Sequence, residues 1–143
     1  MIRMIQEKDI DTVAEIWLDT NISAHNFIDS TYWSSNFEMV KKMLFQAEVY
    51  VYEDNCSIQG FIGLEHNYIS GIFVRHEFQS RNIGKQLMDF VKTIRSELTL
   101  NVYQKNIRAV KFYQREHFEI IQTGIDKDTN EKEYSMMWKQ QSI

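Results

Sequence analysis

The chain has 143 residues, of which 43% are hydrophobic and 25% are charged, and its formal net charge is −4 at pH 7. This length predicts a single domain over residues 1–143, and the negative charge argues against general binding to nucleic acid, which needs a basic surface. The sequence has no apolar run of about 18 residues, so we expect no membrane span. A single cysteine, Cys56, excludes an internal disulfide and favours a cytoplasmic location.

The first part of the chain alternates between a short strand and helices. Residues 2–5 predict a strand, and Asp9 is the expected N-cap of a helix whose Ile10, Val13 and Trp17 fall at helical spacing. Residues 23–35 look irregular or briefly helical, and residues 37–46 carry a second apolar stripe. We therefore expect two helices and a connecting arm before the second strand.

The rest of the chain predicts a sheet with two further helices. Three neighbouring strands joined by short turns indicate an antiparallel meander, at residues 49–52, 61–64 and 68–74. A helix, a strand, a second helix and the two strands of a closing hairpin follow, at residues 83–97, 98–102, 107–116, 119–125 and 134–138. The order βααβββαβαββ is that of a mixed α/β fold.

The connection after the strand that ends at Val74 has the composition of an anion site. The polar loop Gln79-Ser80-Arg81-Asn82 opens into a helix through Ile83-Gly84-Lys85. Because free backbone N–H groups at a helix N-terminus bind phosphate, we expect this loop to hold a phosphorylated cofactor. The loop is also compatible with an ordinary strand-to-helix connection that has a basic tip.

Two other phosphate motifs are absent, since neither GxxxxGK[ST] nor GxGxxG occurs in the chain. The stretch from Gln79 to Gly84 instead resembles the Q/R-x-x-G-x-G/A pyrophosphate loop of the GNAT superfamily of acyl-CoA-dependent N-acetyltransferases, with Asn82 in place of its first glycine. Asn tolerates a left-handed backbone, so we expect the loop to keep its shape.

A second segment, from Asn106 to Phe118, is similar to the superfamily's later N-x-x-A-x-x-F-Y-x-x-x-G-F element, with His117 in place of the glycine. His is another residue enriched in the left-handed region, where helices often end. Two such elements in the right order make the resemblance strong over residues 58–139. Residues 16–32 also resemble the N-terminal part of a small bacterial subgroup typified by YjaB.

The resemblance implies the GNAT fold, a central and mostly antiparallel sheet whose fourth and fifth strands splay apart. It implies that acetyl-CoA enters this gap, with its pyrophosphate on the loop and its pantetheine arm along the open strand edge. The cofactor-binding residues expected on this basis are Ile72, Phe73, Val74, Gln79, Ser80, Arg81, Asn82, Ile83, Gly84, Lys85 and Asn106.

Acetyl transfer also needs a base for the amine, whose free pKa is about 10.4, and an acid for the departing thiolate. By the resemblance, Tyr113 protonates the sulfur, and a backbone N–H around Phe73 or Val74 stabilises the oxyanion. Tyr113 can also be read as a core residue of its helix, and Asn106 as a simple N-cap.

The acceptor side is less determined by the sequence. Glu65 is the best-placed carboxylate for the general base, with Glu77 and His76 as the next candidates, although a solvated surface charge also explains each of the three. His25, Phe27 and Tyr32 lie in an aromatic-rich arm that suits a substrate pocket, and the same rings suit simple packing of the arm on the sheet.

We expect an N-acetyltransferase that moves an acetyl group from acetyl-CoA to a primary amine of a small molecule, peptide or protein by direct attack in a ternary complex. The alternative is a catalytically weak acyl-CoA sensor, which the two replaced glycines keep open and the retained Tyr113 disfavours. An unrelated nucleotide-binding domain would leave the second element unexplained. We expect a monomer or homodimer, and no metal, because the four histidines are scattered.

Overall fold

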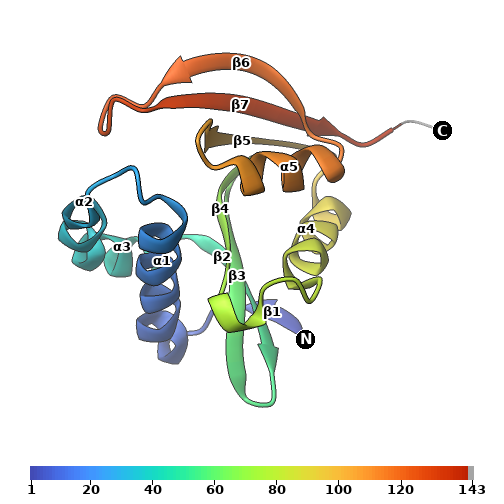
Figure 1. Cartoon of the computed structure of the whole chain (residues 1–143). Coiled ribbons are helices and arrows are strands. Elements are labelled where there is room, and N and C mark those ends of the chain that lie inside the picture. The colour runs from blue at the N-terminus through green and yellow to red at the C-terminus, as the bar shows by residue number, and fades with distance from the viewer. Residues whose placement is uncertain (142–143) are drawn as a thin grey trace.

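The computed structural model describes residues 1–141, which form a seven-stranded sheet with helices on both faces (Figure 1). The strands lie in the order β1-β2-β3-β4-β5-β7-β6, and neighbours are antiparallel except for β4 with β5. Their bounds are Ile2–Met4 (β1), Glu48–Asp54 (β2), Ser57–Glu65 (β3), Tyr68–Val74 (β4), Glu97–Tyr103 (β5), Glu119–Ile125 (β6) and Lys132–Lys139 (β7). The mixed α/β class and the mostly antiparallel sheet predicted from the sequence are confirmed.

The helices comprise Ile10–Ala24 (α1), Ser30–Ser35 (α2), Phe37–Leu44 (α3), Ile83–Ile94 (α4) and Ile107–Arg115 (α5), with 3-10 turns at Glu7–Asp9 and His76–Phe78. Three α-helices therefore precede β2, where the sequence predicted two and an arm. The arm forms α2 because Asp29 caps it, accepting a hydrogen bond from Thr31 N at 2.9 Å, and because Trp33 packs edge-on against Trp17. Within residues 1–141, no helix has the length and apolar character to cross a membrane.

Asp9 takes the N-cap position of α1, as predicted, but its side chain makes no capping hydrogen bond to that helix. A 3-10 turn precedes α1, and the Asp9 carboxylate accepts from Gln6 N at 2.8 Å instead of capping α1. Asp9 is buried and pairs with the Arg3 guanidinium at 2.7 Å, which also bonds Glu53. Arg3 of β1 therefore links the start of α1, through Asp9, to β2, through Glu53. The hydrogen bond from Arg3 also lowers the pKa of Asp9.

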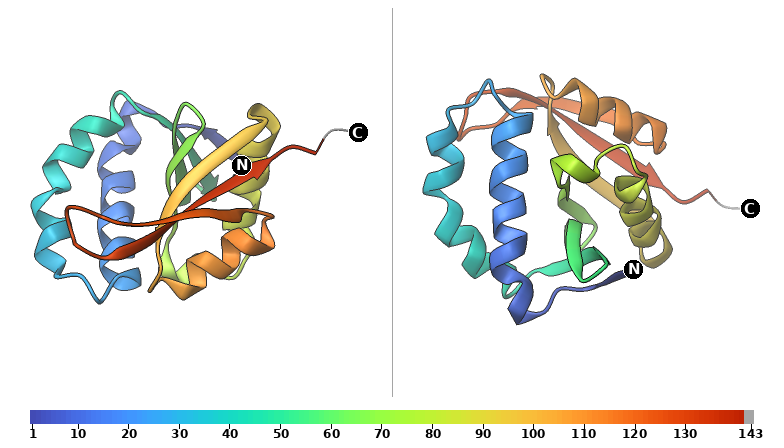
Figure 2. Two further views of the ribbon diagram at one scale, coloured as in Figure 1. Left: turned by 90° about the horizontal axis from the view of Figure 1, so that it is seen from above. Right: turned by 60° about the horizontal axis from the view of Figure 1, so that its bottom comes forward.

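Different helices cover the two faces of the sheet, as Figure 2 shows for α1 and α4. α1 buries Val13 and Ile16 against one face of β3 and β4, and α4 buries Leu87 and Val91 against the opposite face. Each such side chain contributes roughly 1.5–3 kcal/mol relative to exposure. β4 therefore lies between two packed layers.

The gap that the resemblance implied lies between β4 and β5. These strands pair at one position, Tyr68 with Thr99, and Thr99 N donates to Asn67 O at 2.9 Å. Beyond this junction β4 stays paired with β3, while β5 pairs along its length with β7. In the described part of the chain, the second edge of β4 after Tyr68 thus has no partner strand, which confirms the predicted splay.

Candidate active site

The loop before α4 presents a row of unpaired backbone N–H groups. Asn82 has a φ of 65° and so takes the left-handed conformation expected where the motif carries glycine, and Ser80 also has a φ of 65°. Within residues 1–141, no backbone N–H from Ser80 to Lys85 donates a hydrogen bond to the protein. These groups lie at the positive end of the α4 dipole, which is the geometry that binds phosphate.

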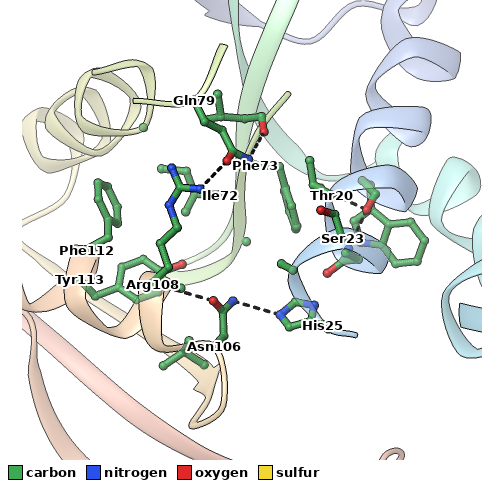
Figure 3. Close-up of a pocket in the computed structure, with 18 of the residues that line it drawn as sticks. Thr20, Ser23, His25, Ile72, Phe73, Gln79, Asn106, Arg108, Phe112 and Tyr113 are labelled. Carbon is green, nitrogen blue, oxygen red and sulfur yellow. Dashed lines mark hydrogen bonds between the residues drawn. The ribbon is translucent and has the colours of Figure 1, made fainter. Parts of the chain in front are cut away.

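Side-chain hydrogen bonds brace this loop. Gln79 Nε2 donates to Val74 O at 3.0 Å, and Arg108 of α5 donates to Gln79 Oε1 at 2.7 Å and to Ser80 Oγ at 3.3 Å (Figure 3). Arg108 therefore places a positive charge beside the free N–H groups, while the Gln79 side chain links Arg108 to the end of β4. Sequence reasoning missed Arg108, whose signal was its position directly before the alanine of the second element.

The other predicted loop residues differ in what their side chains do. Ile83 is 3% exposed and packs in the core, so it offers its N–H alone. Lys85 pairs with Glu116 at 3.4 Å, and Arg81 is exposed above the Phe78 ring and does not line the cavity described next. An anion at this loop would therefore meet backbone N–H groups more than side chains.

A cavity of about 1270 Å³ extends from this loop, along the open edge of β4, to the end of α1. Ile72, Phe73 and Val74 line it on β4, and Asn106 and Tyr113 line it on the α5 side. A diphosphate joined to an extended amide-bearing arm fits these features, since free N–H groups lie at one end and an unpaired strand edge along the middle.

Asn106 and Tyr113 lie at the two ends of α5. Asn106 Oδ1 accepts from Ala109 N at 3.3 Å, which confirms that Asn106 caps the helix. Tyr113 is 7% exposed, and its ring packs against Phe118 and Phe112. Burial, and secondarily the nearby Tyr68, raise the pKa of Tyr113, so its hydroxyl stays protonated at neutral pH.

His25, at the end of α1, reaches across the cavity to α5. Asn106 Nδ2 lies 3.1 Å from His25 Nε2 (Figure 3), and because Asn106 Oδ1 is occupied, the amide nitrogen donates and Nε2 accepts. The imidazole stacks on Trp33 and meets Tyr103 edge-on. Burial lowers the pKa of His25 to about 4, which keeps the ring neutral.

Three predicted acceptor-side residues do not line this cavity. Phe27 and Tyr32 line a separate pocket of about 240 Å³, although Phe27 also contacts His25 edge-on. Glu65 is exposed at the end of β3, paired with Tyr68 across the β3–β4 turn, and is not part of the cavity wall. The structure therefore brings His25, but not Glu65, to the residues around Tyr113.

Two carboxylates that sequence reasoning missed do line the cavity. Asp126 follows β6 and accepts a hydrogen bond from the Tyr103 hydroxyl at 2.5 Å. Glu133 of β7 lies directly opposite Tyr103 in the β5–β7 ladder. With Tyr68 of β4, these residues form an aromatic and acidic wall at the end of the cavity away from the phosphate loop.

Comparison with known proteins agrees with this geometry. The family model described as an acetyltransferase (GNAT) domain matches residues 17–131. The peptidyl-lysine N-acetyltransferase YiaC of Escherichia coli (strain K12) is 32% identical over 140 residues, 96% of each chain.

Solved structures show the same fold. Apo-form YjaB from Escherichia coli has a TM-score of 0.85 at 21% identity, covering 96% of this chain and 95% of its own. PaiA N-acetyltransferase from Thermoplasma acidophilum, in complex with coenzyme A, has a TM-score of 0.81 at 19% identity, covering 97% and 98%. The family match spans most of the sequence, and the chain belongs to the GNAT acetyltransferase family.

Proposed function

We propose that this GNAT acetyltransferase moves the acetyl group of acetyl-CoA to the side-chain amine of lysine residues in proteins or peptides. The observation that carries this proposal is one continuous cavity with a phosphate-binding loop at one end and an aromatic, acidic wall at the other. Aromatic faces and carboxylates attract an ammonium group on an aliphatic stem. The similarity to YiaC, a peptidyl-lysine N-acetyltransferase, supports the same acceptor.

Binding of acetyl-CoA would use the residues at the first end of the cavity. The free N–H groups from Ser80 to Lys85 would hold the pyrophosphate, and Arg108 would add charge-assisted hydrogen bonds. The open edge of Ile72 to Val74 would pair with the pantetheine amides, close to Asn106. Once bound, acetyl-CoA supplies an acetyl group already activated as a thioester.

Chemistry would then use groups on β4 and α5. A backbone N–H around Phe73 or Val74 stabilises the charge that develops on the carbonyl oxygen. Tyr113, kept protonated by burial, donates a proton to the departing sulfur. His25 is a poor proton acceptor here, because its Nε2 already accepts from Asn106 and its pKa is low.

Location and assembly belong to the same proposal. Cys56 is the single cysteine of the chain and is exposed and unpaired, which favours a reducing compartment such as the cytoplasm. Assembly as a monomer or homodimer stays a prediction from the sequence.

The test is acetylation of N-terminally blocked lysine peptides, with thiol release as the rate and mass spectrometry to locate the acetyl group. We expect transfer to the lysine side chain, and no transfer to matched peptides in which methionine replaces lysine. Acetylation of free α-amines or small amines alone would contradict the lysine assignment. Tight coenzyme A binding without turnover on any amine would favour the sensor alternative.

A further inference from the structure

Direct attack on a thioester requires a neutral amine, so a group in the cavity must accept a proton from the lysine ammonium. The carboxylates that line the cavity are the natural candidates, and they are Asp19, Glu77, Glu116, Asp126 and Glu133. Their surroundings differ enough to choose among them.

Four of these carboxylates are exposed or already engaged. Asp19 and Glu77 are exposed to solvent at the rim. Glu116 is buried, but it pairs with Lys85 at 3.4 Å and with Lys92 at 3.5 Å. Asp126 accepts the Tyr103 hydroxyl on one oxygen and the backbone N–H of the following turn on the other.

Glu133 is the carboxylate that remains available. It is half-buried on β7, and within residues 1–141 its side-chain oxygens accept no hydrogen bond and form no ion pair. Its register opposite Tyr103 places it on the sheet face that the arm covers, the same face as Asn101 and Ser135, which are hydrogen-bonded to each other. Glu133 therefore faces the acceptor end of the cavity, and both of its carboxylate oxygens are free to accept a proton.

The groups around Glu133 suit a proton acceptor. Tyr103 lies opposite Glu133 in the strand ladder and donates a hydrogen bond to Asp126, which also lines the cavity. Tyr68 is close enough to both Glu133 and Tyr113 to interact electrostatically with each, and His25 contacts the Tyr103 ring edge-on. Burial and then the Asp126 charge raise the pKa of Glu133, and the Glu133 charge in turn helps to raise the pKa of Tyr68. A raised pKa makes a carboxylate a stronger base.

We propose that Glu133 is the general base of the acetyl transfer. Glu133 takes one proton from the lysine ammonium, and the neutral amine then forms the C–N bond to the acetyl carbonyl. As the C–S bond breaks, Tyr113 gives a proton to the sulfur and is reprotonated by the second proton that nitrogen loses. The products are the amide, the free thiol and one proton, which Glu133 releases to solvent. The proposal rests on the proposed function only in requiring an ammonium acceptor.

The test compares Glu133→Gln with Glu119→Gln, a matched change at an exposed site on the same hairpin. We expect Glu133→Gln to lower kcat/KM at pH 7 by ~10²-fold, the usual range for acid–base catalysis, and to remove the acidic limb of the pH profile. Affinity for coenzyme A, measured by calorimetry, should be unchanged in both variants, which also reports folding. Glu119→Gln should match the wild-type rate.

An acceptor amine that is already neutral at pH 7 shows whether Glu133 acts as a base or only binds the ammonium group, because such an amine has no ammonium proton to lose before it attacks. With a peptide that carries an aminooxy group in place of the lysine amine, the penalty for Glu133→Gln should shrink to a few-fold. Equal penalties for both acceptors would overturn the proposal, as would a Glu133→Gln rate within twofold of wild type. If wild-type protein rejects lysine peptides but accepts other amines, the lysine assignment fails while Glu133 is still tested on those amines.

Discussion

Asn82 and His117 hold left-handed backbone conformations at two places that shape the proposed cofactor site. Their φ values are 65° and 70°, at the start of α4 and after the end of α5. Most residues with a Cβ lose roughly 1–2 kcal/mol in this conformation, and Asn and His occur there more often than others. The left-handed backbone of His117 follows the end of α5 and lets Phe118 N donate a hydrogen bond to Tyr113 O at 3.0 Å. This turn therefore fixes the end of the helix that carries Tyr113, the proposed acid.

Replacement of Tyr113 with Phe removes the proposed proton donor and keeps the ring. Because the ring packing against Phe118 is preserved, we expect coenzyme A affinity to stay nearly unchanged. Turnover should fall by ~10²-fold, the usual range for loss of a general acid. Tyr134→Phe, on a ring outside the cavity, serves as the control and should keep the wild-type rate. Unchanged turnover in Tyr113→Phe, with chemistry rate-limiting, would exclude the role.

The element proposed to bind the cofactor is the junction of the loop with α4, and Gly84 lies in the first turn of that helix. A Cβ added at Gly84 would meet the Phe112 ring at 3.6 Å, an ordinary contact, so the fold accepts a side chain there. A carboxylate at this position also favours the positive helix end. Gly84→Glu should therefore preserve stability while it competes with the pyrophosphate for the same N–H groups.

We expect Gly84→Glu to weaken coenzyme A binding at least tenfold. Two like charges about 4 Å apart near a protein surface repel by about 4 kcal/mol, well above the 1.4 kcal/mol that corresponds to a factor of about ten. Gly124→Glu on the exposed strand β6, where an added Cβ meets no atom within 4 Å, is the matched control. Calorimetry that finds equal affinity in the two variants would place the phosphate site elsewhere.

The sequence predicted the elements whose signals are local. Asn106 as a cap, the left-handed Asn82 and the helix after the loop depend on residues within a turn or two of each other. The insertion of β7 between β5 and β6 could not be predicted, because strand order depends on pairing between distant segments. Glu133 lies opposite Tyr103 because of the register between β5 and β7, and the residues next to Glu133 in the sequence give no sign of this pairing. Glu65 was favoured for its place at a strand end; it does end β3, but it is exposed there and lies outside the cavity wall.

At the scale of the whole molecule, the hydrogen bond between His25 and Asn106 joins the arm to the second half of the fold. His25 follows α1 and Asn106 begins α5, and their side chains meet across the cavity although 81 positions separate them in the sequence. Trp33, Phe27 and Tyr103 pack around the imidazole and reduce its contact with water. A positive charge on His25 would lose solvation there and would turn Nε2 into a donor that faces the Asn106 donor.

Acid should therefore loosen the fold through His25. Its pKa is lowered from 6.5 to about 4, so the unfolded chain binds the proton first as the pH falls. The stability is complete above about pH 6.5 and decreases as the pH falls toward 4, with a slope of at most about 1.4 kcal/mol per pH unit for one proton. Urea unfolding of wild type at about pH 7.5, 6.0 and 5.0 should show this decrease in the free energy of unfolding.

His25→Gln isolates the effect, since Gln can accept from Asn106 but cannot titrate. Its stability should depend less on pH between about 5 and 6.5, while His76→Gln, on an exposed histidine, should follow wild type. Asp9, whose pKa is lowered, loses its contribution only below 3.8, and Glu133, whose pKa is raised, acts in the opposite direction. Asp9 and Glu133 contribute equally in wild type and in His25→Gln, so their contributions cancel in the difference in stability between the two proteins. Parallel curves for wild type and His25→Gln would show that the buried imidazole does not couple the arm to pH.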